Sequence, residues 1–290
     1  MVAAQGNLWA LRSSLFGDRK LQLSRRMMNR ICGLFLTVLG MLELTAAGNA
    51  EELVRREWTV EGVTREALMH VPSGAAHQAT PVVFVFHGHG GSMRQVAQAN
   101  PIHQNWPEAI VVYPQGLPTA GRLTDPTGNL NGWQAGPGDQ GDRDLKFFDV
   151  LRTSLGSDYR IDPKRIYATG HSNGGSFVYL LWAKRGEIFA AFGPAAAITG
   201  PTYGALPPRP VIQIAGEKDT LVKFAWQTRM IESLRRTNQC GDGRLVSPGC
   251  TLYASKIGAP VMTYIYPGGH PFPPEATALI VDFFKNHPKA

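Results

Sequence analysis

The stretch RIYATGHSNGGSF, residues 165–177, holds the strongest structural signal in the sequence. Residues 165–169 are β-branched and aromatic, as in a buried strand, and residues 175–185 are rich in Leu, Ala and aromatics without proline, as in a helix. Between them, a Gly-x-Ser-x-Gly pattern predicts a sharp turn that lifts the Ser172 hydroxyl clear of the sheet. Gly170 and Gly174 fit this turn because a Cβ is not tolerated where the strand bends and the helix packs back. The stretch therefore predicts a nucleophilic serine.

A histidine later in the chain is the predicted general base. An alcohol is a poor nucleophile at its free pKa, so Ser172 needs a base within hydrogen-bond reach and a third group that orients the base. Residues 261–266 form a strand-like run that leads through Pro-Gly-Gly to His270. A loop histidine without function is the alternative, but it explains neither the paired glycines nor the position after a strand. We predict that His270 takes the proton from Ser172.

The orienting acid is predicted on the loop after another strand-like run, residues 210–215. That run ends in a turn with two acids, Glu217 and Asp219. For a serine on a strand-to-helix turn of this kind, the acid precedes the histidine in the chain. We predict Asp219 as the acid, with Glu217 as the alternative.

A glycine-rich loop supplies candidate donors for the charge that develops on the substrate oxygen. The apolar strand candidate at residues 81–86 runs directly into HGHGGS, residues 87–92. A loop of this composition leaves backbone N–H groups pointing outward, as an oxyanion hole requires. We predict one donor from the backbone of Asn173 and a second from His89 or its neighbour.

His87 and His89 also allow a metal-binding interpretation, since they alternate on one face of an extended chain. No third ligand stands at a suitable spacing, and the glycines would then have no role. We therefore predict no metal and no other cofactor. The His87 imidazole is expected to be a structural hydrogen-bonding group under the loop.

The stretch at residues 114–141 is dominated by Gly, Pro, Asn, Asp and Thr. A loop this long in a compact domain is usually functional or mobile. Because it follows a strand on the catalytic side, we predict that it forms a wall over the site, with Trp133 contacting the substrate. The alternative is that Trp133 is a half-buried packing residue. No long helical cap insertion is visible, which predicts an open site.

The rest of the chain alternates strand and helix patterns. This alternation predicts an α/β fold with a mostly parallel, doubly wound sheet and helices on both faces. Residues 57–60 and 65–71 are predicted to form a hairpin at the sheet edge. One helix is predicted to end at residue 155, with Asp142 or Asp144 as its N-terminal cap. The last helix is predicted over residues 274–286.

The front of the chain predicts export. An apolar run at residues 34–42 follows Arg25, Arg26 and Arg30 and precedes small residues at 46–50, as in a secretory signal, and it is too short to be interpreted first as a membrane span. We predict residues 1–50 as an N-terminal extension plus signal peptide and residues 51–290 as one catalytic domain, which is secreted or periplasmic and keeps no stable membrane span. A start at Met27 or Met28 instead of Met1 would give a more regular signal.

Removal of this front part also changes the charge. Residues 1–50 carry six Lys or Arg and two acids, so the net charge falls from +7 to about +3. No Lys/Arg stripe interleaved with aromatics remains, so nucleic acid is not an expected partner. In an oxidising compartment Cys240 and Cys250 are predicted to pair in a disulfide worth about 2–3 kcal/mol, with two free thiols as the alternative.

Several motifs in combination resemble one family, the secreted serine esterases of the α/β-hydrolase fold that include polyhydroxybutyrate depolymerases and feruloyl esterases. The motifs are HGHGGS at 87–92, YPQG at 113–116, Gly-Trp at 132–133, the turn at 170–174, Asp219, and GGH at 268–270. The resemblance covers most of the chain from about residue 54 to residue 284. It implies a triad of Ser172, Asp219 and His270 that cleaves carboxylic esters through an acyl-enzyme, with Trp133 near the substrate.

Two departures from that family bear on the substrate. Phe272 stands where members often carry a tryptophan two residues after the histidine, and residues 51–290 leave no room for a separate polymer-binding domain. The expected partner is therefore a small-molecule or oligomeric ester, of a hydroxycinnamoyl (feruloyl-type) or a short hydroxyalkanoate or short-chain acid. An acyltransferase with the same triad and a non-catalytic binding protein on the same fold are the alternatives.

Overall fold

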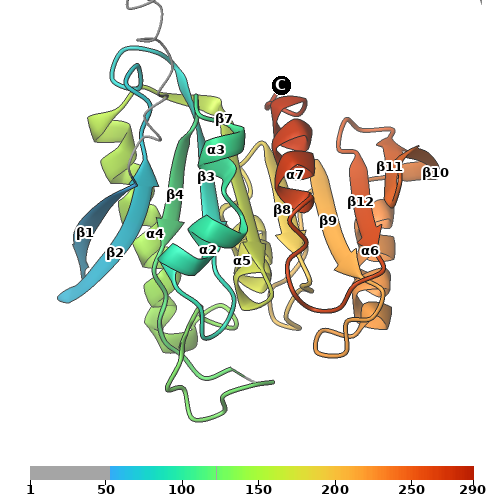
Figure 1. The fold of residues 1–290 in the computed structure, drawn as a ribbon, viewed down its shortest axis with the longest axis horizontal. Coiled ribbons are helices and arrows are strands. Elements are labelled where there is room, and N and C mark those ends of the chain that lie inside the picture. The colour runs from blue at the N-terminus through green and yellow to red at the C-terminus, as the bar shows by residue number, and fades with distance from the viewer. Residues whose placement is uncertain (1–52, 122) are drawn as a thin grey trace, which may run out of the picture. The chain divides into compact units, whose positions relative to one another are not determined.

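The computed structural model describes residues 53–121 and 123–290, the folded unit shown in Figure 1. The predicted signal peptide and the alternative start codons lie outside the described residues, so export stays a prediction. Among the described residues, no helix has the length and apolar character needed to cross a membrane.

The unit is built on a ten-stranded sheet with the order β1-β2-β4-β3-β7-β8-β9-β12-β11-β10. The six central strands from β4 to β12 run parallel, and antiparallel strands flank them on both sides. The strands are β1 (Val54–Val60), β2 (Val63–His70), β3 (Thr80–Phe86), β4 (Ile110–Pro114), β7 (Ile161–His171), β8 (Ala191–Ala195), β9 (Val211–Gly216), β10 (Cys240–Ser247), β11 (Cys250–Ser255) and β12 (Val261–Tyr266). A separate two-stranded ladder joins β5 (Leu117–Pro118) to β6 (Asn131–Gly132).

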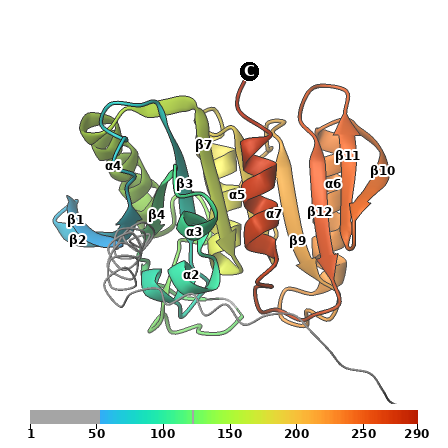
Figure 2. The same ribbon diagram turned by 45° about the horizontal axis from the view of Figure 1, so that its top comes forward.

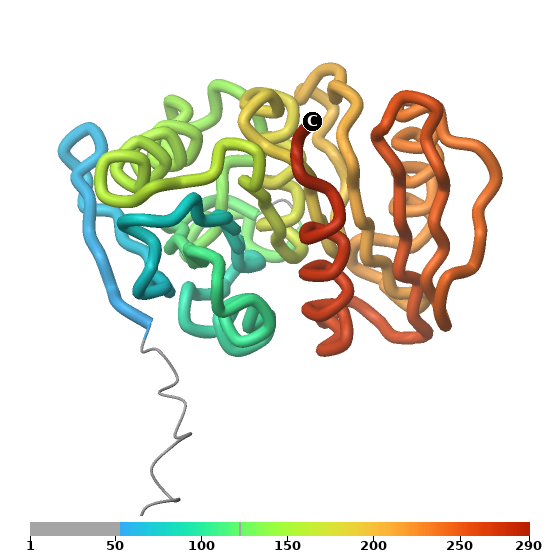
Figure 3. The backbone as a smooth tube through the Cα atoms, turned by 90° about the horizontal axis from the view of Figure 1, so that it is seen from above, coloured from blue at the N-terminus to red at the C-terminus, as the bar shows by residue number. Residues whose placement is uncertain are grey.

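Helices cover both faces of the sheet, as Figure 2 shows. One face carries α2 (Met93–Ala99), α3 (Ile102–Asn105) and α7 (Ala276–Lys285), and the other carries α4 (Arg143–Asp158), α5 (Asn173–Arg185) and α6 (Phe224–Thr237). Seen from above, α2 and α7 lie on the opposite side of the sheet from α4 and α6 (Figure 3). A short 3-10 helix, η1 (Asp139–Asp142), leads into α4. The predicted doubly wound α/β fold is confirmed.

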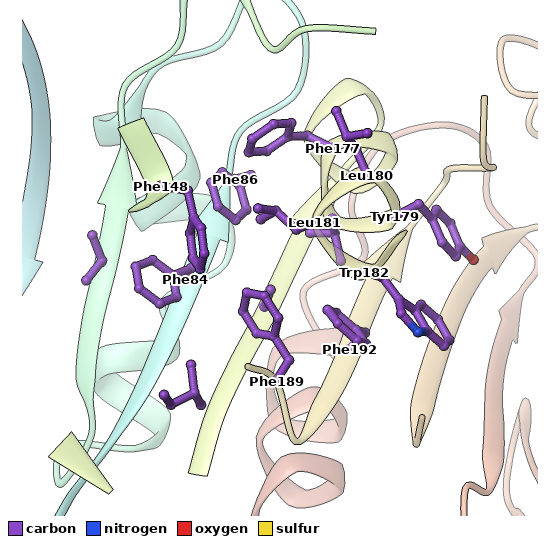
Figure 4. Packing of buried hydrophobic residues seen from close by; sticks show 14 of the residues in the cluster. Phe84, Phe86, Phe148, Phe177, Tyr179, Leu180, Leu181, Trp182, Phe189 and Phe192 are labelled. Atoms are coloured by element: carbon purple, nitrogen blue, oxygen red, sulfur yellow. The ribbon is translucent and has the colours of Figure 1, made fainter. Parts of the chain in front are cut away.

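Each face of the sheet has its own apolar core. On the face covered by α5, aromatic rings pack against one another (Figure 4). Phe84 lies edge-on to Phe148 with 5.0 Å between ring centroids, and Trp182 stacks on Phe192 at 4.7 Å. The opposite face is smaller and holds apolar side chains of α2, α3 and α7, including Val96, Ile102 and Phe284. Strand β3 is buried along its whole length, as expected of a strand covered on both faces.

The predicted edge hairpin and the two predicted helices are present in the structure, and the helices end at slightly different residues than predicted. The edge hairpin is β1 paired with β2, and its turn uses positive φ at Glu61 and Gly62. The helix predicted to end at residue 155 runs to Asp158, and the last helix is shorter at each end than predicted. Neither candidate acid caps α4: Asp142 makes no capping hydrogen bond, and Asp144 is buried in a 2.8 Å ion pair with Arg65.

The predicted disulfide is wrong in this structure, where Cys240 and Cys250 are both free. The reason is the β10–β11 hairpin, which the sequence analysis did not anticipate. Cys240 lies at its open end opposite Ser255, and Cys250 lies beside the turn opposite Ser247. The length of β10 separates the two by roughly 20 Å at the usual rise per residue, far beyond the roughly 7 Å between Cα atoms that a disulfide tolerates.

Candidate active site

Ser172 sits in the tight turn that joins β7 to α5. Its backbone has φ 56° and ψ −119°, a conformation that is unfavourable for a residue with a side chain. Its N–H donates to the carbonyl oxygen of Ala195 at 2.9 Å. A Cβ on Gly174 would collide with the carbonyl oxygens of Phe86 and His87, and one on Gly170 would lie 2.7 Å from the backbone of Gly174. The glycines are therefore required by close packing, as the sequence predicts.

The structure brings Ser172, His270 and Asp219 together from the carboxyl ends of three parallel strands. His270 follows β12, and its Nε2 lies 2.8 Å from Ser172 Oγ. Its Nδ1 lies 2.9 Å from Asp219 Oδ2, on the loop after β9. With Nδ1–H donating to the carboxylate, Nε2 accepts from the serine hydroxyl. This chain of contacts joins a nucleophile, a base and an orienting acid.

The Asp219 carboxylate is fixed on all sides. It is only 4% exposed, and its Oδ1 accepts from the backbone N–H groups of Leu221 and Val222, both at 2.9 Å. Its Oδ2 accepts from Gln227 Nε2 at 3.0 Å as well as from His270. Glu217, the alternative acid, is exposed. The geometry thus selects Asp219 and not Glu217.

Gln227 is a supporting residue that the sequence analysis missed. It is fully buried on α6, where it also donates to the carbonyl of Val222 at 2.7 Å. A glutamine among apolar positions of a helix is the signal that could have found it, because a buried amide needs partners.

The glycine-rich loop after β3 lies against the serine. A Cβ on Gly88 would stand 3.5 Å from Ser172 Cβ. Gly90 N–H donates to Asn131 O at 2.7 Å and Gly91 N–H to Gly88 O at 3.0 Å, whereas the N–H of His89 makes no hydrogen bond within the part of the chain that the structure describes. Asn173 is the first residue of α5, where N–H groups have no intrahelical acceptor. Both predicted oxyanion donors are thus available.

His87 occupies the position expected of a structural group. Its Nδ1–H donates to Gly88 O at 2.7 Å, and its Nε2 accepts from Gly116 N–H at 2.9 Å. Burial lowers its pKa to about 4, so the imidazole is neutral near pH 7. The His89 ring faces Asp125 instead, 3.5 Å from its Oδ2. Because both His87 nitrogens are engaged, the paired-histidine metal interpretation has no support in the geometry.

Trp133 contradicts its predicted role as a substrate contact. Its side chain is 1% exposed and packs against Phe86 and Phe177, with centroids at 5.1 and 5.3 Å. The indole N–H donates to His87 O at 2.9 Å. The Asn173 side chain also holds its backbone, accepting from Trp133 N–H at 2.7 Å and donating to its carbonyl at 3.2 Å. The packing alternative is correct, in a fully buried form.

His171 is a second residue that the sequence analysis did not single out. Its Nε2–H donates to the carbonyl oxygen of His270 at 2.7 Å, and its ring lies 4.9 Å from the His270 ring and 6.1 Å from that of Phe272. Burial lowers the pKa of His171 to about 4. A neutral imidazole therefore ties the loop of His270 to the turn of Ser172.

The chain is similar in sequence and in fold to several known proteins. No family model matches the chain. It is similar to the putative esterase NocK of Nocardia uniformis subsp. tsuyamanensis, with 29% identity over 58% of this chain and 49% of the relative, so the match spans about half of that protein's length. It is also similar to a probable feruloyl esterase C of Aspergillus flavus, with 24% identity over 83% of this chain and 94% of the relative.

Solved structures agree at the level of the fold. A structure described as ferulic acid esterase superposes with a TM-score of 0.59 and 14% identity, covering 81% of this chain and 98% of that one. The relatives in sequence are named esterases, and the structural neighbours, several of them esterases, share the α/β-hydrolase fold.

Proposed function

We propose that this chain, a carboxylic ester hydrolase of the α/β-hydrolase fold, works through an acyl-enzyme formed on Ser172. The observation that carries the proposal is the unbroken line of contacts from Ser172 Oγ through the His270 ring to Asp219, with spacings of 2.8 and 2.9 Å. A serine hydroxyl gains nucleophilicity only when a base at this distance accepts its proton.

The mechanism uses the same groups in both half-reactions, and His270 acts first as base and then as acid in each. Ser172 Oγ attacks the ester carbonyl while His270 Nε2 takes its proton. Asp219 holds the imidazole in the required tautomer and stabilises its charged form. The N–H groups of Asn173 and His89 receive the negative oxygen of the tetrahedral intermediate. His270 then protonates the leaving alcohol, and water repeats the sequence to release the acid and free Ser172.

The substrate class that we propose is an ester of a hydroxycinnamoyl or a short-chain acid, including short hydroxyalkanoates. The name of the relative that is matched over most of its length, probable feruloyl esterase C, supports the first group. A relative named bifunctional acetylxylan esterase/xylanase XynS20E, from Neocallimastix patriciarum, supports short acyl groups, although the match covers 25% of that protein.

We also propose that the enzyme acts outside the cytoplasm. The support is the order of basic, apolar and small residues within residues 25–50. N-terminal sequencing of protein recovered from the periplasm or medium tests this. A mature chain that still carries residues 1–50 would contradict it.

The decisive experiment replaces Ser172→Ala and follows hydrolysis of p-nitrophenyl acetate. We expect kcat to fall by a factor on the order of 10⁴ or more. Ser176→Ala is the matched control, because Ser176 lies one turn along α5 and donates to Ile198 O instead. Mass spectrometry of the unsubstituted enzyme, quenched during turnover, should find the acyl group on Ser172. An acyl group on another residue, or activity in Ser172→Ala, would refute the proposal.

A further inference from the structure

The His89 imidazole is enclosed, although neither of its nitrogens has a hydrogen-bond partner among the residues that the structure describes. Its side chain is only 8% exposed. A Cβ on Gly121 would lie 2.8 Å from its Cε1 and Nε2, and a Cβ on Gly132 would lie 2.7 Å from its Nδ1. Only glycine leaves room for the ring at these two positions, so the ring has a place that is built for it.

A carboxylate faces this ring. Asp125 Oδ2 lies 3.5 Å from His89 Nε2 and also accepts from the N–H of Leu130 at 2.8 Å. Asp125 Oδ1 accepts from the hydroxyl of Thr127 at 2.9 Å and from the N–H of Gly128 at 3.1 Å. These hydrogen bonds, that from Leu130 first, lower the pKa of the Asp125 carboxyl. The imidazole therefore lies beside a negative charge that its own loop holds in place.

The His89 ring is also the only side chain in the turn that carries one of the predicted oxyanion donors. Residues 88–91 read Gly-His-Gly-Gly, and glycine leaves the backbone dihedrals free. Gly90 has φ +73°, and its N–H donates to Asn131 O at 2.7 Å. The N–H of His89 itself makes no hydrogen bond within the described part of the chain. The contacts of the ring are therefore what can hold that N–H group in position.

The position of an oxyanion donor matters for the rate. A donor stabilises the transition state most when it already points at the oxygen that becomes negative, because no reorganisation is then needed during the reaction. A displacement of about 1 Å at a reacting group can cost about 10²-fold in rate. A donor in a turn of three glycines and one histidine therefore needs an anchor outside the turn.

We infer that Asp125 is a positioning residue, which holds the His89 imidazole and through it the His89 N–H group at the substrate oxygen. Gly121 and Gly132 complete the anchor, since each leaves the space that the ring occupies. The inference rests on the proposed acyl-enzyme mechanism. It adds to that mechanism a carboxylate that touches neither the nucleophile nor the base.

The test is a double-mutant cycle of His89→Ala, which keeps the N–H group but removes the ring, and Asp125→Asn, which removes the charge. In each single variant, kcat on p-nitrophenyl acetate should fall by about 10–100-fold, with KM within about twofold of the parent value. The double variant should be no slower than the slower single variant, because both changes release the same N–H group. Asp139→Asn, at an exposed position of η1, is the matched control and should keep the parent rate.

A second measurement separates the position of the donor from general damage to the fold. An alkyl trifluoromethyl ketone adds to a serine hydroxyl and leaves a negative oxygen where the substrate oxygen would stand. Its inhibition constant should rise in both single variants by about the factor by which kcat falls, as expected of a transition-state analogue. The acid limb of the pH profile of kcat/KM, which His270 sets, should stay at the parent pH.

Several outcomes would overturn the inference while the proposed function stands. These are a parental kcat in Asp125→Asn, losses that multiply in the double variant, a shifted acid limb, and a parental affinity of His89→Ala for the ketone. If Asp125→Asn does not fold, Asp125→Ser, whose hydroxyl can still accept a hydrogen bond, takes its place in the cycle. A parent enzyme that neither cleaves the ester nor binds the ketone would instead refute the proposed function, and the inference with it.

Discussion

Two loops at the carboxyl edge of the sheet put their aromatic side chains to opposite uses. The loop after β12 points His270 toward Ser172. Its backbone is held by Tyr266, whose hydroxyl lies 2.6 Å from the carbonyl oxygens of both Gly269 and Pro271, so that they share its one proton. The segment after β4 turns Trp133 into the core instead. Both were predicted to serve the site.

The difference follows from what each ring gains. The indole of Trp133 has one polar atom, which the carbonyl of His87 satisfies inside the core, so burial gains its full apolar area. An imidazole that must exchange protons needs a carboxylate and a hydroxyl, and the carboxyl edge of the sheet brings both to His270. The direction of each side chain is thus set more by the partners that its polar atoms need than by the loop on which it lies.

Within this comparison, the largest effect on activity is expected at Asp219, the acid that orients His270. Asp219→Asn should lower kcat by about 10³–10⁴-fold, because the amide favours the wrong imidazole tautomer. Glu217→Gln, two residues away and exposed, is the matched control and should stay within about twofold. Steady-state kinetics on p-nitrophenyl acetate measures both. A larger loss in Glu217→Gln would reverse the assignment of the acid.

Substitution of Trp133, the other residue of this comparison, is expected to lower the stability of the fold. Trp133→Ala should destabilise the fold by about 3–5 kcal/mol, as for other buried aromatic residues. Trp226→Ala, at a half-buried position on α6, should cost well under half of that. Urea unfolding midpoints provide the measurement. If Trp133→Ala unfolds like the parent but loses activity on bulky esters, Trp133 contacts the substrate after all.

The neutral histidines around the site predict a pH dependence of stability. The pKa of His171 is lowered to about 4 in the fold, against 6.5 as a reference, so the unfolded chain binds the extra proton between these values. The free energy of unfolding should therefore fall as the pH drops from 6.5 to 4, by about 2–3 kcal/mol for this group. His171→Gln should flatten part of that slope in urea titrations at several pH values. An identical slope in the variant would contradict a half-buried, neutral His171.

The smallest effect is expected at the cysteines. Since Cys240 and Cys250 stand at opposite ends of the β10–β11 hairpin, a reductant should leave the unfolding midpoint unchanged. A disulfide would instead make the reduced protein less stable by about 2–3 kcal/mol. A thiol assay on the denatured, unreduced protein should find both cysteines reactive. Unreactive thiols would mean that this hairpin has a different register.

The sequence was most informative where a backbone constraint coincides with chemistry. The glycines around Ser172, the strand before each loop, and the order of serine, acid and histidine predicted the fold class and the three residues that meet at 2.8 and 2.9 Å. The direction of Trp133 depends on packing against Phe86 and Phe177, which lie far away in the sequence, and no local pattern encodes those contacts. The buried amide of Gln227 and the hairpin that separates Cys240 from Cys250 rest on nearby residues, and there the sequence analysis missed a local feature.

Asn173 serves two parts of the molecule at once. Its backbone N–H opens α5 beside Ser172, while its side chain pairs with both backbone groups of Trp133. Under the proposed mechanism, the same residue steadies the transition state and anchors the segment that seals the aromatic interior. Substitutions meant to raise the thermal stability of this enzyme should therefore avoid position 173, because a change there would also alter the position of the N–H group that binds the substrate oxygen.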